Sequence, residues 1–135
     1  MKIFDWHHEK RWTHCTAVIV AAGSATRMRG VDKIMAELCG EPVIAHTIRS
    51  FQNAGCIDEI VVVAREDQLE AIRKISEDKG FHKVQAIVPG GSSRMESVQA
   101  GLNAASKETV LAAVQDGARP LVTEDIICRT VDMAL

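Results

Sequence analysis

The stretch that decides the fold is residues 16–33, TAVIVAAGSATRMRGVDK, where an apolar, β-branched run leads into a glycine-containing loop. Continuous apolar runs of this kind are typical of buried parallel strands, and open α/β sheets bind ligands beyond the carboxyl ends of such strands. The loop carries three cations, Arg27, Arg29 and Lys33. It is therefore the first place to look for a binding site.

Three further apolar runs, residues 59–64, 83–88 and 109–114, alternate with segments of helical periodicity. This alternation predicts βαβ units, and hence a Rossmann-like, three-layer α/β fold with a parallel sheet and helices on both faces. Right-handed crossovers then give the sheet order 3-2-1-4, counted along the chain. The fourth strand has no successor in this sequence to cover it, so it is expected to form an exposed edge.

The helical segments have recognisable starts and apolar faces. Pro42 suits the start of a helix through Phe51, and residues 66–79 form a second helix, while residues 34–38 are expected to be extended. Ser93 and Glu96 have the spacing of a capping box, and Thr123 is a suitable cap for the last helix. The residues expected to face inward are Val98, Leu102 and Ala105 in the third helix, and Ile126, Ile127, Thr130 and Val131 in the last.

Composition limits the classes of protein that are possible. A chain of 135 residues with 47% apolar content suits one domain, which we place at residues 16–135 after an extension at 1–15. The net charge of -2 argues against nucleic-acid and membrane-surface partners. No signal sequence or membrane-length run is present, so a cytoplasmic location is expected. The four cysteines form no C-x-x-C pair, so zinc and a disulfide framework are not expected, and the thiols should be buried or idle.

Two later loops should emerge at the same sheet edge as the first. Residues 90–97 offer glycine backbone groups with Arg94 and Ser97 nearby, and Asp116 ends the fourth strand, where a carboxylate suits magnesium or a sugar hydroxyl. The first loop is neither a Walker A loop nor a dinucleotide fingerprint, because Met28 and Ala25 occupy required glycine positions. Each loop also has an ordinary structural interpretation, as a solvated loop, a capped helix or an Asp-Gly turn. Together the three favour a nucleotide site.

The motifs AAGSATRM, Asp32-Lys33, LCGEPVIAHTI, GGSSRMESVQAGL and QDGARP resemble those of a specific family. They are similar, in the same order, to the cytidylyltransferases that make CDP-methylerythritol from CTP and 2-C-methyl-D-erythritol 4-phosphate, an isoprenoid precursor step. The resemblance covers about residue 16 to the last residue and implies a nucleotidyltransferase-type fold. Ribitol-5-phosphate and other sugar-phosphate cytidylyltransferases share much of this pattern, so the acceptor stays open.

The resemblance also implies roles for individual residues. Arg27 and Lys33 match the catalytic cations at the triphosphate, and Asp116 matches a carboxylate near ribose, Mg²⁺ and acceptor, with Arg119 on the acceptor side. The positions that match the rest of the nucleotide site are Ala21, Ala22, Gly23, Gly91, Ser92, Arg94 and Ser97. The implied cofactor is Mg²⁺, and the implied assembly is a homodimer or another self-association.

The resemblance further implies a chain longer than this one, with an arm that builds the dimer and helps to bind the acceptor. We therefore expect a shortened form of the domain with impaired turnover. The alternative is a non-catalytic nucleotide-binding or assembly fragment.

Overall fold

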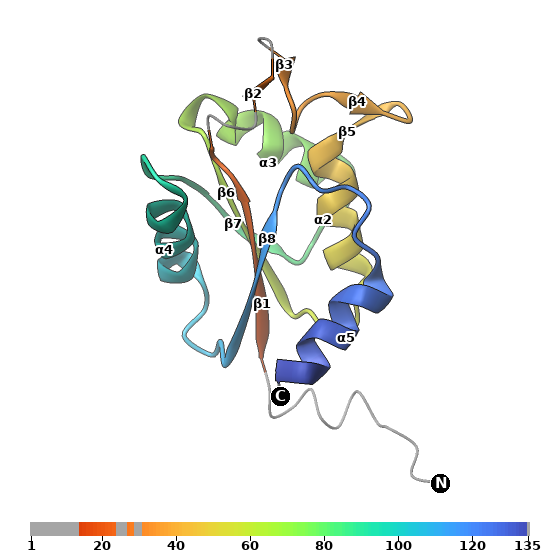
Figure 1. Ribbon diagram of the computed structural model, residues 1–135, viewed down its shortest axis with the longest axis vertical. Coiled ribbons are helices and arrows are strands. Elements are labelled where there is room, and N and C mark those ends of the chain that lie inside the picture. The colour runs from red at the N-terminus through yellow and green to blue at the C-terminus, as the bar shows by residue number, and fades with distance from the viewer. Residues whose placement is uncertain (1–13, 24–26, 29–30, 135) are drawn as a thin grey trace, which may run out of the picture.

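The structure is a computed structural model that describes residues 14–134 except 24–26 and 29–30, so most of the predicted extension at 1–15 lies outside it. Its centre is a parallel four-stranded sheet in the order β7-β6-β1-β8 (Figure 1). These strands are β1 (Cys15–Ala21), β6 (Glu59–Ala64), β7 (Val84–Pro89) and β8 (Leu111–Asp116). Counted along the chain, this is the predicted order 3-2-1-4, which is therefore confirmed.

The two central strands explain why the sheet forms. Every residue of β1 and of β6 is buried, so each strand is covered on both faces, as its unbroken apolar sequence predicts. Their β-branched side chains fit a pleated surface packed from both sides. The register places Val18 of β1 between Val61 of β6 and Val114 of β8.

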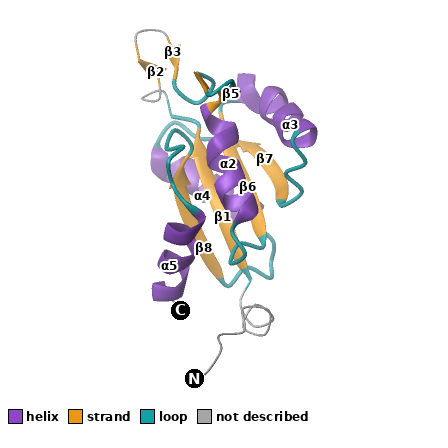
Figure 2. Ribbon diagram, turned by 90° about the vertical axis from the view of Figure 1, so that its right-hand side faces the viewer, coloured by secondary structure: helices purple, strands orange, loops and turns teal. Residues whose placement is uncertain are grey.

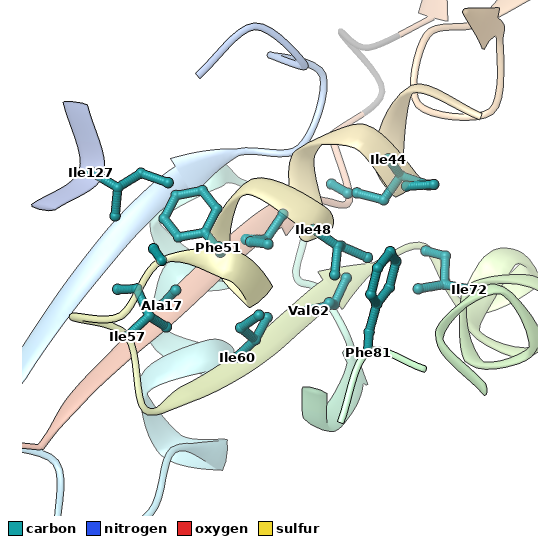
Figure 3. Close-up of a cluster of buried hydrophobic side chains, with 14 of the residues drawn as sticks. Ala17, Ile44, Ile48, Phe51, Ile57, Ile60, Val62, Ile72, Phe81 and Ile127 are labelled. Atoms are coloured by element: carbon teal, nitrogen blue, oxygen red, sulfur yellow. The ribbon is translucent and has the colours of Figure 1, made fainter. Parts of the chain in front are cut away.

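Helices cover both faces of the sheet, as Figures 1 and 2 show, but unequally. One face carries α2 (Val43–Asn53), α5 (Glu124–Ala134) and α3 (Leu69–Asp78), which follows a short 3₁₀ turn η2 (Glu66–Gln68). On this side Ile48, Phe51 and Ile72 pack against Ile60 and Val62 (Figure 3). On the other face, among the described residues, the one helix is α4 (Arg94–Ala104), which covers a smaller cluster of valines from β1 and β6.

The predicted inward faces of α4 and α5 are partly wrong. In α4 the buried residues are Ser97 and Gly101, while Leu102 is 40% exposed. Gly101 lies directly against the sheet, because a Cβ atom added there would collide with Val18 and Val63. In α5 the buried residues are Ile127 and Val131, one helical turn apart, and Ile126 is 53% exposed.

Thr123 caps the N-terminus of α5, as predicted, because its hydroxyl accepts a hydrogen bond from the Ile126 N–H at 3.2 Å. Thr130 also differs from the prediction. It is exposed, and its hydroxyl donates back to the Ile126 carbonyl within the helix. The buried face of α5 is therefore narrower than the one predicted from the apolar and β-branched residues in its sequence.

Strand β8 forms an edge of the sheet, as predicted, and only one of its faces is covered. Leu111 and Ala113 pack against the cluster beneath α2 and α5. On the opposite face Ala112 is exposed and Val114 is 40% exposed, because α4 packs over β1, β6 and β7. The β8 edge thus leaves apolar surface open on the α4 side.

Two short hairpins connect β1 to α2. The first pairs β2 (Arg27–Met28) with β3 (Val31–Asp32), and the second pairs β4 (Glu37–Leu38) with β5 (Glu41–Pro42). The segment 34–38, predicted to be extended, instead begins with a turn, because the Met35 and Ala36 N–H groups both bond to the Asp32 carbonyl. Only its last two residues are in a strand.

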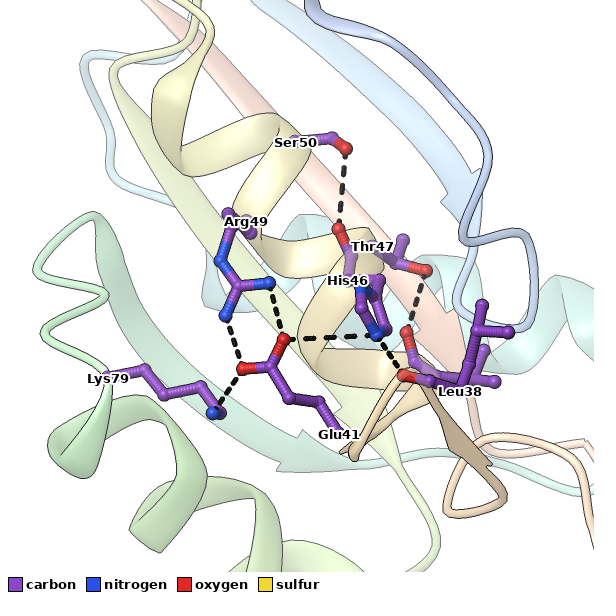
Figure 4. Close-up of polar contacts among 8 residues, drawn as sticks. Leu38, Glu41, His46, Thr47, Arg49, Ser50 and Lys79 are labelled. Carbon is purple, nitrogen blue, oxygen red and sulfur yellow. Dashed lines mark hydrogen bonds and ion pairs between the residues drawn. The ribbon is translucent and has the colours of Figure 1, made fainter.

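Glu41 links the β4–β5 hairpin to α2 and to the end of α3 (Figure 4). Its carboxylate accepts two hydrogen bonds from the Arg49 guanidinium of α2, at 2.8 and 2.6 Å, and one from the Lys79 ammonium just after α3. These hydrogen bonds from Arg49 and then Lys79 lower the pKa of Glu41 to about 2. Arg49 also lies over the Phe81 ring, 5.7 Å from its centre.

Candidate nucleotide-binding cleft

The loops after β1, β7 and β8 meet at the carboxyl ends of the strands, as the sheet order requires. A Cβ atom added to Gly90 would collide with the Ala22 methyl group and the Ser97 hydroxyl, so the second loop lies directly against the first. A Cβ at Gly117 would similarly meet the side chain of Ala21, the last residue of β1, so the third loop lies against the end of that strand. Glycine at these two positions allows the close approach.

These loops enclose a cleft of about 520 Å³ at the switch point between β1 and β8. Ala22, Gly23 and Lys33 come from the first loop region, and Asp116 comes from the end of β8. The second loop contributes four predicted site residues, Gly91, Ser92, Arg94 and Ser97, and also Ser93. A cleft that gathers two cations, one carboxylate and a helix start is suited to a polyanionic ligand with a polar body.

The start of α4 is shaped by hydrogen bonds within the second loop. The Ser93 hydroxyl accepts from the Glu96 N–H at 3.1 Å, which confirms half of the predicted capping box. The Glu96 carboxylate reaches back one residue further than a capping box requires, and accepts from both the N–H and the hydroxyl of Ser92 at 2.7 Å. These bonds lower the pKa of Glu96 below its usual value. The loop is therefore held in place before any ligand arrives.

Ser97 is buried behind this loop, with 2% of its surface exposed. Its hydroxyl accepts the Gly91 N–H at 3.2 Å. The predicted nucleotide-binding role of Ser97 thus includes fixing the backbone of Gly91 at the cleft wall. Because Ser97 sits on the first turn of α4, the same contact links the loop to the positive end of the helix dipole.

Two contacts hold the third loop. The Gly117 N–H donates to the Val20 carbonyl at 2.8 Å, and its own carbonyl accepts from the buried hydroxyl of Thr47 on α2 at 2.9 Å. The Asp116 carboxylate accepts the Ala118 N–H at 3.0 Å and lies 3.9 Å from the Arg119 guanidinium. With 40% of its side chain exposed, Asp116 is accessible from the cleft.

Lys33 is exposed, and its neighbour Asp32 is firmly held. The Asp32 carboxylate accepts the Ile34 N–H at 3.2 Å and a hydrogen bond from the Gln68 amide, and it lies 3.7 Å from Arg65. The register of the β2–β3 hairpin places Arg27 opposite Asp32 in the strand pair. The Arg27 side chain lies outside what the structure describes, so its predicted role stays a prediction.

Two predicted site residues lie elsewhere. Ala21 is buried within β1, where it forms part of the wall behind Gly117. Arg119 lines a neighbouring hollow with Leu121 and Val122 instead of the cleft itself. Sequence reasoning did not assign Glu96 or Thr47 to the site. The capping-box spacing points to Glu96, whereas no local signal indicates that Thr47 meets a loop 70 residues later.

The donors available to a metal ion in the cleft are few. Within the described part of the chain, no cluster of three or more His, Cys, Asp or Glu side chains is placed to hold a metal ion. Asp116 is a single carboxylate on the cleft wall. This set fits Mg²⁺ when it is shared with substrate phosphates, because Mg²⁺ is commonly bound through one or two carboxylates, phosphates and water.

The sheet order, the layers and the cleft define the chain as a doubly wound α/β protein with its site at the switch point. The 2-C-methyl-D-erythritol 4-phosphate cytidylyltransferase family matches residues 15–135. The chain belongs to this family.

Individual relatives agree with this membership. The enzyme of that name from Alkaliphilus oremlandii (strain OhILAs) is 43% identical over 121 residues, and the one from Dehalococcoides mccartyi (strain CBDB1) is 42% identical over 118 residues. These matches cover 88% and 87% of this chain. The crystal structure of 4-diphosphocytidyl-2C-methyl-D-erythritol synthase from Anaerococcus prevotii DSM 20548 has a TM-score of 0.77 and 29% identity over 92% of the chain.

The chain spans about half the length of the relatives it matches, 51% and 52% of the two curated enzymes and 52% of the solved one. The residues that match the family, 15–135, include those that line the cleft. Among the described residues, no helix is long and apolar enough to cross a membrane.

Proposed function

We propose that this chain binds CTP in the cleft between β1 and β8, and serves cytidylyl transfer to 2-C-methyl-D-erythritol 4-phosphate, with pyrophosphate as the second product. The observation that carries the proposal is the gathering of Lys33, Arg94 and Asp116 around one cleft in a member of this family. The names of the curated relatives favour this acceptor over ribitol 5-phosphate.

The reaction requires chiefly that the protein position the two substrates and stabilise negative charge. A phosphate monoester has a second pKa of about 6, so the acceptor is largely dianionic near neutral pH and attacks the α-phosphorus without a general base. The barrier lies in bringing two anions together in line and in the charge that develops on the leaving pyrophosphate. Lys33, together with Arg27 from the same loop region, is proposed to offset that charge.

The second loop is proposed to hold the nucleotide. The Gly91 and Ser92 N–H groups donate to Ser97 and Glu96, so the backbone of this part of the cleft wall is held in place. Arg94, on the first turn of α4, adds a cation where the helix dipole also favours negative charge. A site that is ordered in advance loses less entropy when the ligand binds.

Mg²⁺ and the acceptor are proposed to lie on the Asp116 side of the cleft. Asp116 would hold the ion jointly with the nucleotide phosphates, and bound Mg²⁺ would supply further neutralisation of phosphate charge. Arg119 lies beside Asp116 and opens onto the neighbouring hollow. This position is suited to the phosphate of the acceptor.

Calorimetric titration of the chain with CTP, UTP, ATP and GTP, each with Mg²⁺, tests the proposal. We expect CTP to bind most tightly, by about tenfold or more over the other three. In Lys33→Ala, CTP affinity should fall by roughly tenfold or more, because a charge-assisted contact with phosphate is lost. The melting temperature should change little, since the Lys33 side chain is exposed.

Lys74→Ala is the matched control, because Lys74 is an exposed lysine of α3 outside the cleft. It should leave CTP affinity unchanged. Equal affinity for all four nucleotides, or equal losses in Lys33→Ala and Lys74→Ala, would refute a CTP site at this cleft.

We also propose that the chain self-associates through the open face of β8 with a second copy of itself, and that it works in the cytoplasm. The support is the exposed apolar surface of the edge strand β8, where Ala112 is exposed and Val114 is 40% exposed, and of Val110 just before it, which is 68% exposed. Light scattering across a concentration series should show masses above the monomer, and Val114→Lys should shift the distribution toward the monomer. A purely monomeric wild type would exclude this association.

A further inference from the structure

Two cysteines that are far apart in the sequence meet at the opposite end of the sheet from the cleft. Cys56 lies in the turn between α2 and β6, and Cys128 lies on α5, 72 residues later. Their sulfur atoms are 2.7 Å apart. This separation is closer than ordinary contact between two thiol sulfurs, so the fold already brings the two side chains to bonding range.

The surroundings hold this pair together independently of the thiols. Ile127 and Val131 anchor α5 in the core, with 5% and 4% of their surfaces exposed, and Cys128 lies between them in sequence. Cys56 is itself part of the same buried cluster, with 6% exposed. The approach of the two sulfurs therefore follows from helix packing, and it does not depend on a flexible loop.

We propose that Cys56 and Cys128 form a reversible disulfide when the chain meets a disulfide oxidant such as oxidised glutathione. Cys128 is the more exposed of the two and is the thiol that the oxidant reaches first.

The disulfide forms through two successive thiol–disulfide exchange steps. The Cys128 sulfur, as thiolate, attacks one sulfur of oxidised glutathione, forming a mixed disulfide and releasing one glutathione. The Cys56 sulfur then attacks the Cys128 sulfur and releases the second glutathione. The two protein thiols lose two electrons and two protons, and both protons end on the released glutathione thiols.

The other two cysteines provide internal comparisons. Cys15, at the start of β1, is buried, and burial raises its pKa to about 11. Burial likewise raises the pKa of Cys56, so the reaction is expected to be slow near neutral pH and faster in mild alkali. Cys39 is exposed in the turn of the β4–β5 hairpin.

The experiment exposes the folded chain to oxidised glutathione, alkylates the remaining thiols, and maps the tryptic peptides without reduction. The four cysteines fall in four separate tryptic peptides, residues 12–27, 34–49, 50–65 and 108–129, so every pairing gives a distinct mass. We expect peptides 50–65 and 108–129 to be joined, and Cys15 and Cys39 not to be cross-linked. Dithiothreitol should separate them.

The cross-link should also raise the melting temperature by roughly 5–10 °C, because it closes a long loop in the unfolded chain. Cys39→Ser should keep both the cross-link and this gain, and Cys128→Ser should lose both. A sample of the chain that is unfolded in urea and oxidised in parallel shows which cysteines pair when the fold is absent.

Three results would overturn the proposal: both thiols alkylated after oxidation of the folded chain, Cys56 joined to Cys15 instead, or the same mixture of pairs from folded and unfolded chain. None of these readouts depends on nucleotide binding, so this proposal and the proposed CTP site fail separately.

Discussion

Strands β6 and β8 flank the same strand β1, and they are built very differently. In the register of the sheet, Val18 lies between Val61 on β6 and Val114 on β8. Val61 is fully buried, whereas Val114 is 40% exposed. The difference arises from α4, which packs over β1 and β6 and leaves its side of β8 open. The β6 side is thus packed on both faces, while the β8 side carries Asp116 and an exposed apolar surface.

The largest expected effect contrasts these two valines directly. Val61→Ala should lower the free energy of unfolding by about 2–3 kcal/mol, because it removes two buried methyl groups and leaves a cavity. Val114→Ala should cost less than about 1 kcal/mol, since part of that side chain already lies in solvent. Urea unfolding of both variants measures the two values. Equal losses would mean that the β8 edge is as well packed as the centre.

A smaller, pH-dependent effect tests the ion pairs that Glu41 makes with Arg49 and Lys79. Arg49 and Lys79 lower the pKa of Glu41 to about 2 from an ordinary 4.5. A carboxyl group whose pKa is lower when folded stabilises the protein above its unfolded pKa, and this contribution is lost as pH falls toward its folded pKa. The melting temperature of wild type should therefore exceed that of Glu41→Gln near pH 6, and the gap should close between about pH 4.5 and 2.

Glu37→Gln removes an exposed carboxylate from the same hairpin and serves as the control for this profile. It should leave the melting temperature close to that of wild type near pH 6. A gap between wild type and Glu41→Gln that stays constant with pH would show that the Glu41 contacts do not depend on its charge.

The sequence was most informative about elements and their order. The apolar runs identified the four main strands, and the handedness of crossovers was sufficient to order them, so the position of the cleft was predicted correctly. Lys33, Ser92 and Asp116 meet there because β1, β7 and β8 end at the same edge of the sheet. This part of the prediction depends on topology and needs no knowledge of side-chain packing.

Side-chain packing set the limit of prediction. Leu102 and Ile126 have apolar side chains at helical spacing, yet both are exposed, because the small residues Ser97 and Gly101 decide how α4 lies on the sheet and Ile127 and Val131 anchor α5. The pairing of Cys56 with Cys128 has no local signal, since 72 residues separate them. The thiols are predicted to be buried or idle; Cys15 and Cys56 are buried, Cys128 is partly buried and Cys39 is exposed.

The central claim is that a nucleoside triphosphate binds at the β1–β8 switch point, and one measurement tests it most directly. CTP with Mg²⁺ is titrated into ¹⁵N-labelled protein while the backbone amide signals are followed. A second hollow, of about 510 Å³ between α3 and β7, serves as the internal comparison.

We expect the amide signals of Gly91, Ser92 and Ala118 to shift on titration, while those of Gln85 and Ala86 in the α3–β7 hollow stay in place. Shifts confined to Gln85 and Ala86, or no shift at the three cleft residues at saturating CTP, would contradict it.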